Sequence, residues 1–303
     1  MNILVMGAGA LGSAIGGFLA KSGNNVSLIG REKHISAINQ NGLKISGIWG
    51  EHLVKNLKTS VNSVQDVILL TTKSTDTIIA AKEILPYIGE NTLIISLQNG
   101  VGNEQILQEI CGKKHVLGGM VIIGFEMVDY GHVKVTVFAD KVKIGEMDHT
   151  LSLRVKDIVS VFNEANIPTE AVDNINQHLW GKLLYNSCLN PLGALLNVKY
   201  GELKNENTWR IIQDIIKEAF LVTKAAGIEL LWGSASEYEE VLSLKQIPPT
   251  KDHRPSMLQD IEKGRKTEID FLNGKIVSLG KEYGISTPVN SMLCELIRFK
   301  EGV

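Results

Sequence analysis

The chain has 303 residues, of which 44% are hydrophobic, and its 31 basic residues nearly balance 33 acidic ones. A chain of this length buries a sizeable core and most often forms two domains. Because no long run of like charge occurs, the composition argues against a nucleic-acid-binding surface or a membrane-surface patch.

Cysteine usage and the start of the chain indicate the compartment. The three cysteines, Cys111, Cys188 and Cys294, are widely spaced and odd in number. This pattern fits a reducing compartment and neither a disulfide framework nor a metal cluster, so we expect no metal. The chain opens on the apolar run MNILVMG without a signal-peptide pattern, and no segment approaches the ~20 uninterrupted apolar residues that span a bilayer. We therefore expect a cytoplasmic protein.

From the start to about residue 145, β-rich runs alternate with helical patterns. The runs are NILVMG, VSLIG, VILLTT, TLIISLQ and VLGGMVII. Continuous apolar strands separated by helices predict a mostly parallel sheet covered on both faces, which is an α/β doubly wound, Rossmann-like fold. The segment VKVTVFADKVKIGEMD alternates more clearly and predicts an antiparallel addition at the edge of that sheet.

The loop GAGALG follows the first strand and opens the helical run SAIGGFLAKSG. In a dinucleotide-binding turn, Gly7 allows the tight turn, Gly9 lets the backbone approach a pyrophosphate, and Gly12 permits close packing of helix on strand. The helix N-terminus supplies amide hydrogens to the phosphates. The alternative is a turn that merely needs glycine. The loop residues predicted to contact a cofactor are Gly7, Gly9, Ala10, Leu11 and Gly12.

Arg31 follows the second strand, at a position where an NAD-preferring protein commonly places an acidic residue. An arginine there can pair with a 2′-phosphate, which favours NADPH as the cofactor. Lys33 can share this role. The alternative is a solvated surface arginine, and the sequence does not decide whether NADH is also used.

Two further polar signals lie just beyond buried strands. VILLTT is followed by Lys73, and TLIISL is followed by Gln98, Asn99 and Gly100. Ligands of open α/β sheets bind outside the carboxyl ends of the strands, so both signals are candidate binding residues. An Asn-Gly pair is also an ordinary turn former, and Lys73 can simply be the hydrophilic exit from a strand.

In the second half of the chain the β signal disappears and helical periodicity takes over. The helical stretches are HLWGKLLYNSCLNPLG, then NTWRIIQDIIKEAFLVTKAAG, and a last long pattern from Ser256 to about Tyr283. We therefore expect a Rossmann-like NADP-binding domain over residues 1–170 and an all-α substrate-binding and catalytic domain over residues 171–303. No long linker occurs, so we expect the domains to pack directly and to leave a cleft between them.

Lys182, Asn186 and Asn190 recur at every fourth position of the first helical stretch, and His178 belongs to the same column. Successive members drift only about 40° around the helix axis, so they share one face. The column either meets water, or it meets a ligand that needs one cation and several amides. Asparagine is a poor helix former, which makes the second alternative worth considering. A lysine ammonium there can donate a proton to a carbonyl oxygen as a hydride arrives at the carbon.

The segment SMLQDIEKGRKTEIDFLNG carries the second polar constellation. Ser256 and Gln259 have capping-box spacing, which predicts that Ser256 caps a helix. A hydroxyl at a helix start also suits a substrate carboxylate. Glu268 lies in an otherwise apolar turn, where a buried carboxylate needs a partner. Lys182 is one candidate partner, and Arg265 is a simpler one.

Together these motifs resemble the ketopantoate reductase (2-dehydropantoate 2-reductase) family over essentially the whole chain. The resemblance rests on GAGALG, Arg31, TTK to Lys73, LQNG around Asn99, WGKLLYNSCLNPL and SMLQDIEKGRKTEIDFLNG. The first motif is shared by many dehydrogenases, whereas the last two together are specific. The resemblance implies an NADPH-dependent reductase that converts 2-dehydropantoate to (R)-pantoate on the route to pantothenate and coenzyme A.

The resemblance also implies residue roles. Lys182 matches the general acid that protonates the ketone oxygen, and Glu268 matches the acid that positions the substrate and tunes that lysine. The chain departs from the family where many members have an asparagine three residues before the serine, because it has His253 there. This departure puts the identity of the keto acid in doubt. Implied substrate contacts are Asn99, Asn186, Asn190 and Ser256; implied cofactor contacts are the glycine loop, Arg31, Lys73, Asn99 and Glu268.

Two alternatives remain beside ketopantoate reduction. One keeps the reaction but changes the substrate to another branched 2-oxo acid. The other is a protein that senses NADPH without turning anything over, although such a sensor has no need for both Lys182 and Glu268. In each case the expected partner is a small molecule, not a nucleic acid or a membrane, and a homodimer is possible.

Overall fold

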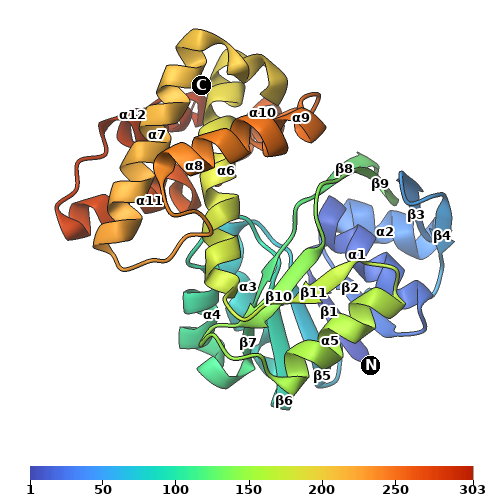
Figure 1. Ribbon diagram of the computed structural model, residues 1–303. Coiled ribbons are helices and arrows are strands. Elements are labelled where there is room, and N and C mark those ends of the chain that lie inside the picture. Colours follow the sequence, from blue (N-terminus) through green and yellow to red (C-terminus); the bar gives the residue numbers. More distant parts are fainter. Residues whose placement is uncertain (303) are drawn as a thin grey trace. The chain divides into compact units, whose positions relative to one another are not determined.

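The computed structural model describes residues 1–302, which form two compact units. The first unit comprises Met1–Gln98 and Gly102–Ile175, and the second comprises Asn99–Val101 and the chain from Asn176 onward. Figure 1 colours the elements in chain order. Within residues 1–302, no helix is long and apolar enough to cross a membrane.

A seven-stranded sheet forms the centre of the first unit, with strand order β11-β10-β7-β6-β5-β1-β2. β1 pairs in parallel with both β2 and β5, whereas β10 runs antiparallel to β7. The predicted Rossmann-like fold is therefore confirmed. The strands are β1 (Asn2–Met6), β2 (Asn25–Ile29), β5 (Gln65–Leu70), β6 (Ile88–Ser96), β7 (Val116–Met120), β10 (Val142–Glu146) and β11 (Thr169–Ala171).

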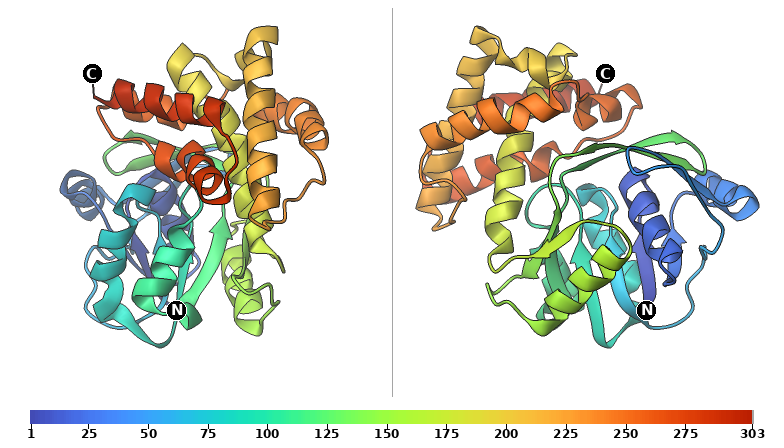
Figure 2. Two further views of the ribbon diagram at one scale, coloured as in Figure 1. Left: turned by 90° about the vertical axis from the view of Figure 1, so that its left-hand side faces the viewer. Right: turned by 45° about the vertical axis from the view of Figure 1, so that its right-hand side comes forward.

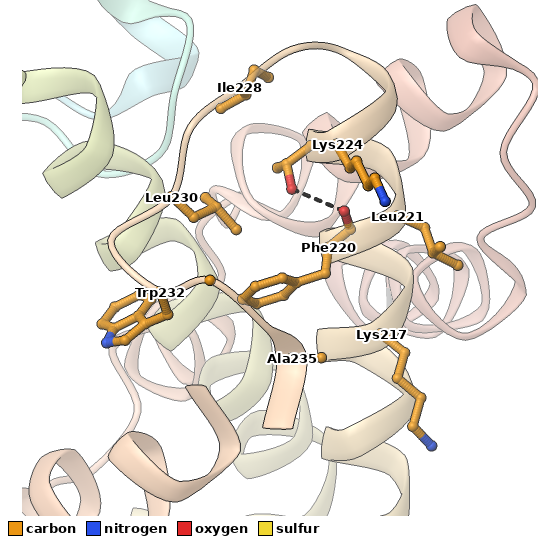
Figure 3. A pocket seen from close by; sticks show the side chains of 10 residues that line it. Lys217, Phe220, Leu221, Lys224, Ile228, Leu230, Trp232 and Ala235 are labelled. Carbon is orange, nitrogen blue, oxygen red and sulfur yellow. Dashed lines mark hydrogen bonds between the residues drawn. The ribbon is translucent and has the colours of Figure 1, made fainter. Parts of the chain in front are cut away.

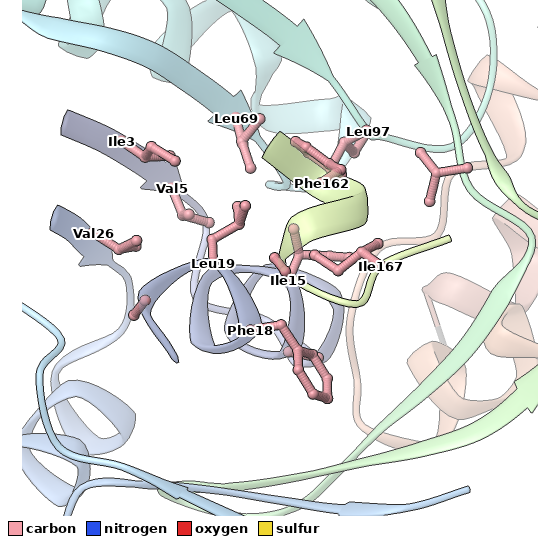
Figure 4. Close-up of a cluster of buried hydrophobic side chains, with 14 of the residues drawn as sticks. Ile3, Val5, Ile15, Phe18, Leu19, Val26, Leu69, Leu97, Phe162 and Ile167 are labelled. Atoms are coloured by element: carbon pink, nitrogen blue, oxygen red, sulfur yellow. The ribbon is translucent and has the colours of Figure 1, made fainter. Parts of the chain in front are cut away.

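Helices cover both faces of this sheet because alternate side chains of each strand point to opposite faces. On one face, Val5 and Leu69 belong to a core cluster with Ile15, Leu19 and Phe162 (Figure 4). On the other face, the neighbouring residues of the same strands pack on the helices after β5 and β6, in a cluster that includes Leu4, Ile68, Ile84 and Leu107. The helices are α1 (Ala10–Lys21), α2 (Glu32–Asn41), α3 (Thr77–Ile84), α4 (Asn103–Cys111) and α5 (Leu153–Glu164).

The prediction of one antiparallel addition at the sheet edge was wrong in part. The segment VKVTVFADKVKIGEMD divides between β10 of the main sheet and β9 (His132–Phe138) of a second sheet, whose order is β4-β3-β9-β8. β10 is also not an edge strand, because the three-residue β11 extends the sheet beyond it. A strand this short gives no periodic signal in the sequence. The other strands of the second sheet are β3 (Leu43–Gly47), β4 (His52–Val54) and β8 (Ile123–Asp129).

The second unit is helical. Gly227, with φ +67°, follows α7 and confirms the predicted helix stop. α7, α11 and α12 pack on one another, as two views show (Figure 2). The helices are α6 (Ile175–Leu196), α7 (Glu206–Ala225), α8 (Ala235–Val241), α9 (Ile247–Thr250), α10 (Ser256–Glu262), α11 (Asn273–Tyr283) and α12 (Pro288–Glu301).

The long helix predicted from Ser256 to about Tyr283 is in fact broken. α10 stops at Glu262, and Gly264 takes the left-handed conformation (φ +59°) that ends many helices. A 3-10 turn at Ile269–Phe271 precedes α11. Buried apolar residues of α10 and of the turn before α11 share one core cluster, against which Val277 of α11 also packs. The apolar spacing therefore continues across the break and conceals it. Glu268 therefore lies in a turn and not on a helix.

His34 of α2 joins three elements of the first unit. It is 3% exposed, its Nδ1 accepts the Gly131 N–H at 2.9 Å, and its Nε2 lies 2.9 Å from the Ser13 hydroxyl. Because Nδ1 accepts, the proton of the neutral ring is on Nε2, which donates to Ser13. Burial lowers the pKa of His34 below its ordinary value of 6.5. The folded chain therefore holds this ring in its neutral form.

This geometry makes folding stability depend on pH. As the pH falls below about 6.5, the unfolded chain protonates this histidine before the folded chain does, so the free energy of unfolding decreases. We expect His34→Gln, which cannot titrate, to show a shallower decrease between pH 7.5 and 5.5 in urea unfolding. Equal decreases in the wild type and the variant would remove His34 from the pH response.

Candidate active site

The glycine loop between β1 and α1 is shaped by close backbone contacts. Gly7 has φ +119°, and the Thr71 hydroxyl donates to its carbonyl oxygen at 2.7 Å. A Cβ on Gly12 would lie 2.2 Å from that same oxygen and 2.4 Å from the Thr71 hydroxyl, so only glycine fits there. A Cβ on Gly9, in contrast, would meet no atom within 4 Å. Gly9 therefore leaves open space above the loop.

The loop and the start of α1 together fit the pyrophosphate of a dinucleotide. Gly9 is the N-cap of α1, and no side chain caps the first-turn amides. Such amides and the positive end of the helix dipole attract phosphate. The open space above Gly9 is where a phosphate can approach this backbone.

Alanine at Gly9 and alanine at Gly12 should have opposite effects. We expect Gly9→Ala to leave the free energy of unfolding within about 0.5 kcal/mol of the wild type. Its methyl group should lower dinucleotide affinity by about tenfold or more, which corresponds to about 1.4 kcal/mol. Gly12→Ala should destabilise the fold by about 1–3 kcal/mol through overpacking. Urea unfolding and a binding titration measure both quantities; unchanged affinity in Gly9→Ala would contradict the assignment.

The other candidate cofactor residues lie at strand ends of the first unit. Arg31, exposed, follows β2 and is the N-cap residue of α2, and Lys33 is exposed in the first turn of that helix. Lys73, half-buried, follows β5. The buried Gln98 amide donates to the Lys73 carbonyl at 3.3 Å and to the Thr72 hydroxyl at 3.2 Å. Gln98 thus ties the carboxyl end of β6 to that of β5.

A small polar cavity of about 10 Å³ lies in the second unit. It brings together five residues that the sequence singled out as ligand contacts. Sequence reasoning missed three others, although Asp260 lies four residues after Ser256 and therefore on the same face of α10. The cavity is lined by Asn99, Asn186, Asn190, Ser256, Met257, Asp260, Glu268 and Leu272.

Hydrogen bonds fix the orientation of these side chains. Asn190 donates to Asn186 Oδ1 at 3.1 Å, and the Ser256 hydroxyl donates to Asn190 Oδ1 at 3.3 Å. Asn99 donates to Glu268 Oε2 at 2.9 Å. The Asn186 amide NH2 has no partner within residues 1–302, so it can donate to a ligand.

Ser256 does not cap its helix as predicted. Pro255 is the N-cap residue of α10, and no side chain caps that helix. The Ser256 hydroxyl turns instead to Asn190, a residue 66 positions earlier in the chain. The capping-box spacing is present, but the tertiary partner determines where the hydroxyl points.

The polar column on α6 is not a solvated face. Asn186 is 8% exposed and Asn190 is 4% exposed. Buried amides need hydrogen-bond partners, and Asn186 and Asn190 find them in the polar cavity. Lys182 and His178 are half-buried. Lys182 lies one turn before Asn186 on the same helix and does not itself line the cavity.

His253, the departure from the family pattern, is not among the residues that line this cavity. Its ring packs against the buried Tyr200, with ring centroids 5.1 Å apart. Burial lowers the pKa of His253, so the ring favours its neutral form. The neighbouring Arg254 forms an ion pair with Glu262.

A larger cavity of about 510 Å³ lies beside α7 (Figure 3). Its floor is apolar, with Phe220, Leu230 and Trp232, and it contains none of the residues predicted from the sequence. Lys217 at this cavity forms an exposed ion pair with Asp214 at 3.3 Å. The smaller cavity is the candidate site, because oriented amides and a carboxylate converge there.

The glycine loop on a Rossmann-like sheet, and the amide and carboxylate cluster of a helical unit, define a dinucleotide-dependent oxidoreductase. Comparison with family profiles matches residues 3–149 to "Ketopantoate reductase PanE/ApbA" and residues 174–301 to "Ketopantoate reductase PanE/ApbA C terminal". The chain belongs to the ketopantoate reductase family.

Individual relatives agree with this assignment. The 2-dehydropantoate 2-reductase of Aquifex aeolicus (strain VF5) is 40% identical, over 99% of this chain and 97% of its own length. A PanE/ApbA family ketopantoate reductase from Ralstonia eutropha JMP134 is 32% identical with a TM-score of 0.89, over 100% of this chain and 99% of its own. D-mandelate dehydrogenase, solved with NADH and anilino(oxo)acetate, is 30% identical with a TM-score of 0.90, over 100% of this chain and 98% of its own. The family and this neighbour indicate a nicotinamide cofactor.

Proposed function

We propose that this chain reduces 2-dehydropantoate to (R)-pantoate with NADPH, on the route to pantothenate and coenzyme A. The observation that carries the proposal is the cluster of mutually oriented side chains formed by Asn99, Asn186, Asn190, Ser256 and Glu268. The relatives named as 2-dehydropantoate 2-reductases support the choice of substrate.

Each side chain of the cluster has a distinct task in this proposal. Asn186, with its available amide NH2, donates a hydrogen bond to the substrate. Ser256 and Asn190 hold each other in place and orient the substrate, and Asn99 holds the Glu268 carboxylate. The amides and the hydroxyl orient a keto acid through hydrogen bonds, and a cation supplies the positive charge.

Lys182 is the proton donor in this mechanism. Its ammonium group protonates the ketone oxygen while the carbon is reduced, and before that step it stabilises the negative charge that develops on the oxygen. Lys182 lies on the same helix as Asn186 and Asn190, which places the acid and the orienting amides on one rigid element. Glu268 positions the substrate and tunes this lysine.

The cofactor, when bound, supplies the hydride. We propose that Gly7, Gly9, Ala10, Leu11 and Gly12 hold its pyrophosphate through the open backbone of the loop and the start of α1. Arg31 pairs with the 2′-phosphate, which makes NADPH the preferred cofactor, and Lys73 contributes a second cationic contact. Asn99 and Glu268 are also assigned to the nicotinamide end.

We propose that residues 1–170 form the cofactor-binding domain and residues 171–303 form the substrate-binding domain. We also propose that the protein acts in the cytoplasm, because its three cysteines are all thiols, as in a reducing compartment. A homodimer is compatible with this function.

A second candidate keeps the chemistry and changes the substrate. D-mandelate dehydrogenase, which was solved with anilino(oxo)acetate, aligns with this chain at a TM-score of 0.90. The fold therefore also suits an aryl 2-oxo acid.

NADPH oxidation by the purified chain distinguishes these candidates. We expect the highest kcat/KM with 2-dehydropantoate and (R)-pantoate as the product, which chiral chromatography identifies. A higher kcat/KM with an aryl 2-oxo acid such as phenylglyoxylate would favour the second candidate. NADPH binding without turnover of any 2-oxo acid would instead indicate a sensor.

A further inference from the structure

Helix α6 contains a proline, Pro191, one residue after Asn190. Proline has no backbone N–H, so the carbonyl four residues earlier, that of Ser187, loses its donor within the helix. Ser187 is 0% exposed. A buried carbonyl without a donor costs about 1–3 kcal/mol, so the fold needs a substitute donor at this point.

Asn273, the first residue of α11, provides that donor. Its amide Nδ2 donates to the Ser187 carbonyl oxygen at 3.1 Å and to Asn290 Oδ1 at 3.0 Å. Because the backbone carbonyl can only accept, the atom that faces it must be the amide NH2. Asn273 Oδ1 has no partner within residues 1–302, so the side chain is held through its NH2 alone.

A buried carboxylate anchors the other end of this chain of hydrogen bonds. Asn290, in the first turn of α12, donates its side-chain amide to Glu218 Oε2 at 2.7 Å and its backbone N–H to the same oxygen at 3.0 Å. Glu218 of α7 also accepts the Val289 N–H at 2.8 Å and is 8% exposed. The network therefore fixes Asn273 against three other helices of the second unit.

The bond from Asn273 to Ser187 joins two walls of the candidate site. Ser187 directly follows Asn186, and Asn273 directly follows Leu272; both of these neighbours line the cavity. We propose that Asn273 is a positioning residue, which holds the proline-interrupted turn of α6 in register with the turn that carries Glu268. This inference rests on the proposed function, because the alignment of these two turns matters only if their side chains bind the keto acid that is reduced.

Asn273→Leu tests the proposal, because leucine has a similar size and no donor. We expect kcat/KM for 2-dehydropantoate to fall on the order of 10- to 100-fold, since small misplacements of reacting groups have effects of this size. The dissociation constant for NADPH should change much less than kcat/KM, because the glycine loop and Arg31, which are proposed to hold the phosphates, belong to the first unit.

Pro191→Ala provides the matched rescue. Alanine restores the backbone N–H that donates to the Ser187 carbonyl within the helix, so Asn273 is no longer needed for that bond. We expect the double variant Pro191→Ala/Asn273→Leu to recover most of the kcat/KM lost in Asn273→Leu. Asn290→Leu serves as the control: it disrupts the same network without removing the Ser187 donor, so Pro191→Ala should not rescue it.

The wild type, Pro191→Ala, Asn273→Leu and the double variant form a double-mutant cycle for stability. This measurement does not depend on the substrate. We expect the effects at positions 191 and 273 on the urea midpoint to be non-additive. If Asn273→Leu alone does not fold, recovery of folding in the double variant is the same result. Additive effects on both kcat/KM and the midpoint would overturn the proposal. If the wild type does not reduce any 2-oxo acid, the proposed function is refuted. If the urea midpoints are non-additive in that case, the coupling between Pro191 and Asn273 still holds.

Discussion

Replacement of Lys182 by alanine is expected to lower kcat for 2-dehydropantoate on the order of 100-fold or more. The variant lacks the ammonium that protonates the ketone oxygen, and water must then supply the proton without being oriented. Lys182 lies on α6 one turn before Asn186, whose amide remains in the variant to bind the substrate. The NADPH dissociation constant should stay unchanged, because the variant does not alter the glycine loop or Arg31 of the first unit. Steady-state NADPH oxidation and a fluorescence titration measure the two quantities.

Lys217→Ala is the control for this experiment. Lys217 is a lysine of the same unit, exposed on α7 and paired with Asp214, and no proposed role involves it. Its kcat should equal that of the wild type. An unchanged kcat in Lys182→Ala would remove this lysine from the mechanism, and an NADPH affinity lost together with kcat would assign it to the cofactor instead.

Arg31→Asp is expected to reverse the cofactor preference. A hydrogen bond to a charged group contributes about 1.5–3 kcal/mol, so its loss should weaken NADPH binding by about 10- to 150-fold. The new carboxylate also repels the 2′-phosphate, whereas it can accept hydrogen bonds from the ribose hydroxyls of NADH. The ratio of kcat/KM for NADPH to that for NADH should fall by at least the same factor.

Lys82→Asp on α3 is the matched control, because it makes the same charge reversal at another exposed position of the first unit. It should leave the ratio unchanged. If Lys33 shares the phosphate, Lys33→Ala should cause a smaller loss than Arg31→Asp. A ratio that does not change in Arg31→Asp would show that the phosphate is held elsewhere.

The sequence predicted those parts of the fold whose signals are local. Ile3–Met6 of β1 and Val67–Leu70 of β5 are buried, as their continuous apolar pattern predicts for a sheet covered on both faces. The glycine loop was located by its place between a strand and a helix. Asparagine at positions 186 and 190 suggested a ligand-facing column, because asparagine is a poor helix former, but the sequence left a solvated face as the alternative. The structure shows that both residues are buried.

The parts that the sequence did not predict depend on contacts between distant segments. Ser256 has the spacing of a helix cap, yet its hydroxyl bonds to Asn190. Gly264 ends α10, but apolar residues on both sides pack into one core and continue the helical spacing. The partner of Glu268 was expected to be a cation, and the structure adds Asn99, a residue 169 positions away. No local pattern encodes such pairings.

The central claim is that one helix presents both the proton donor and the orienting amides to a keto acid. A crystal structure of the chain with NADP⁺ and (R)-pantoate tests it most directly. We expect the Lys182 Nζ within about 3 Å of the C2 hydroxyl oxygen, which is hydrogen-bonding reach for proton transfer. We also expect the Asn186 amide to donate to the same molecule. A Lys182 side chain directed to solvent, with the C2 oxygen bound by other groups, would contradict the mechanism.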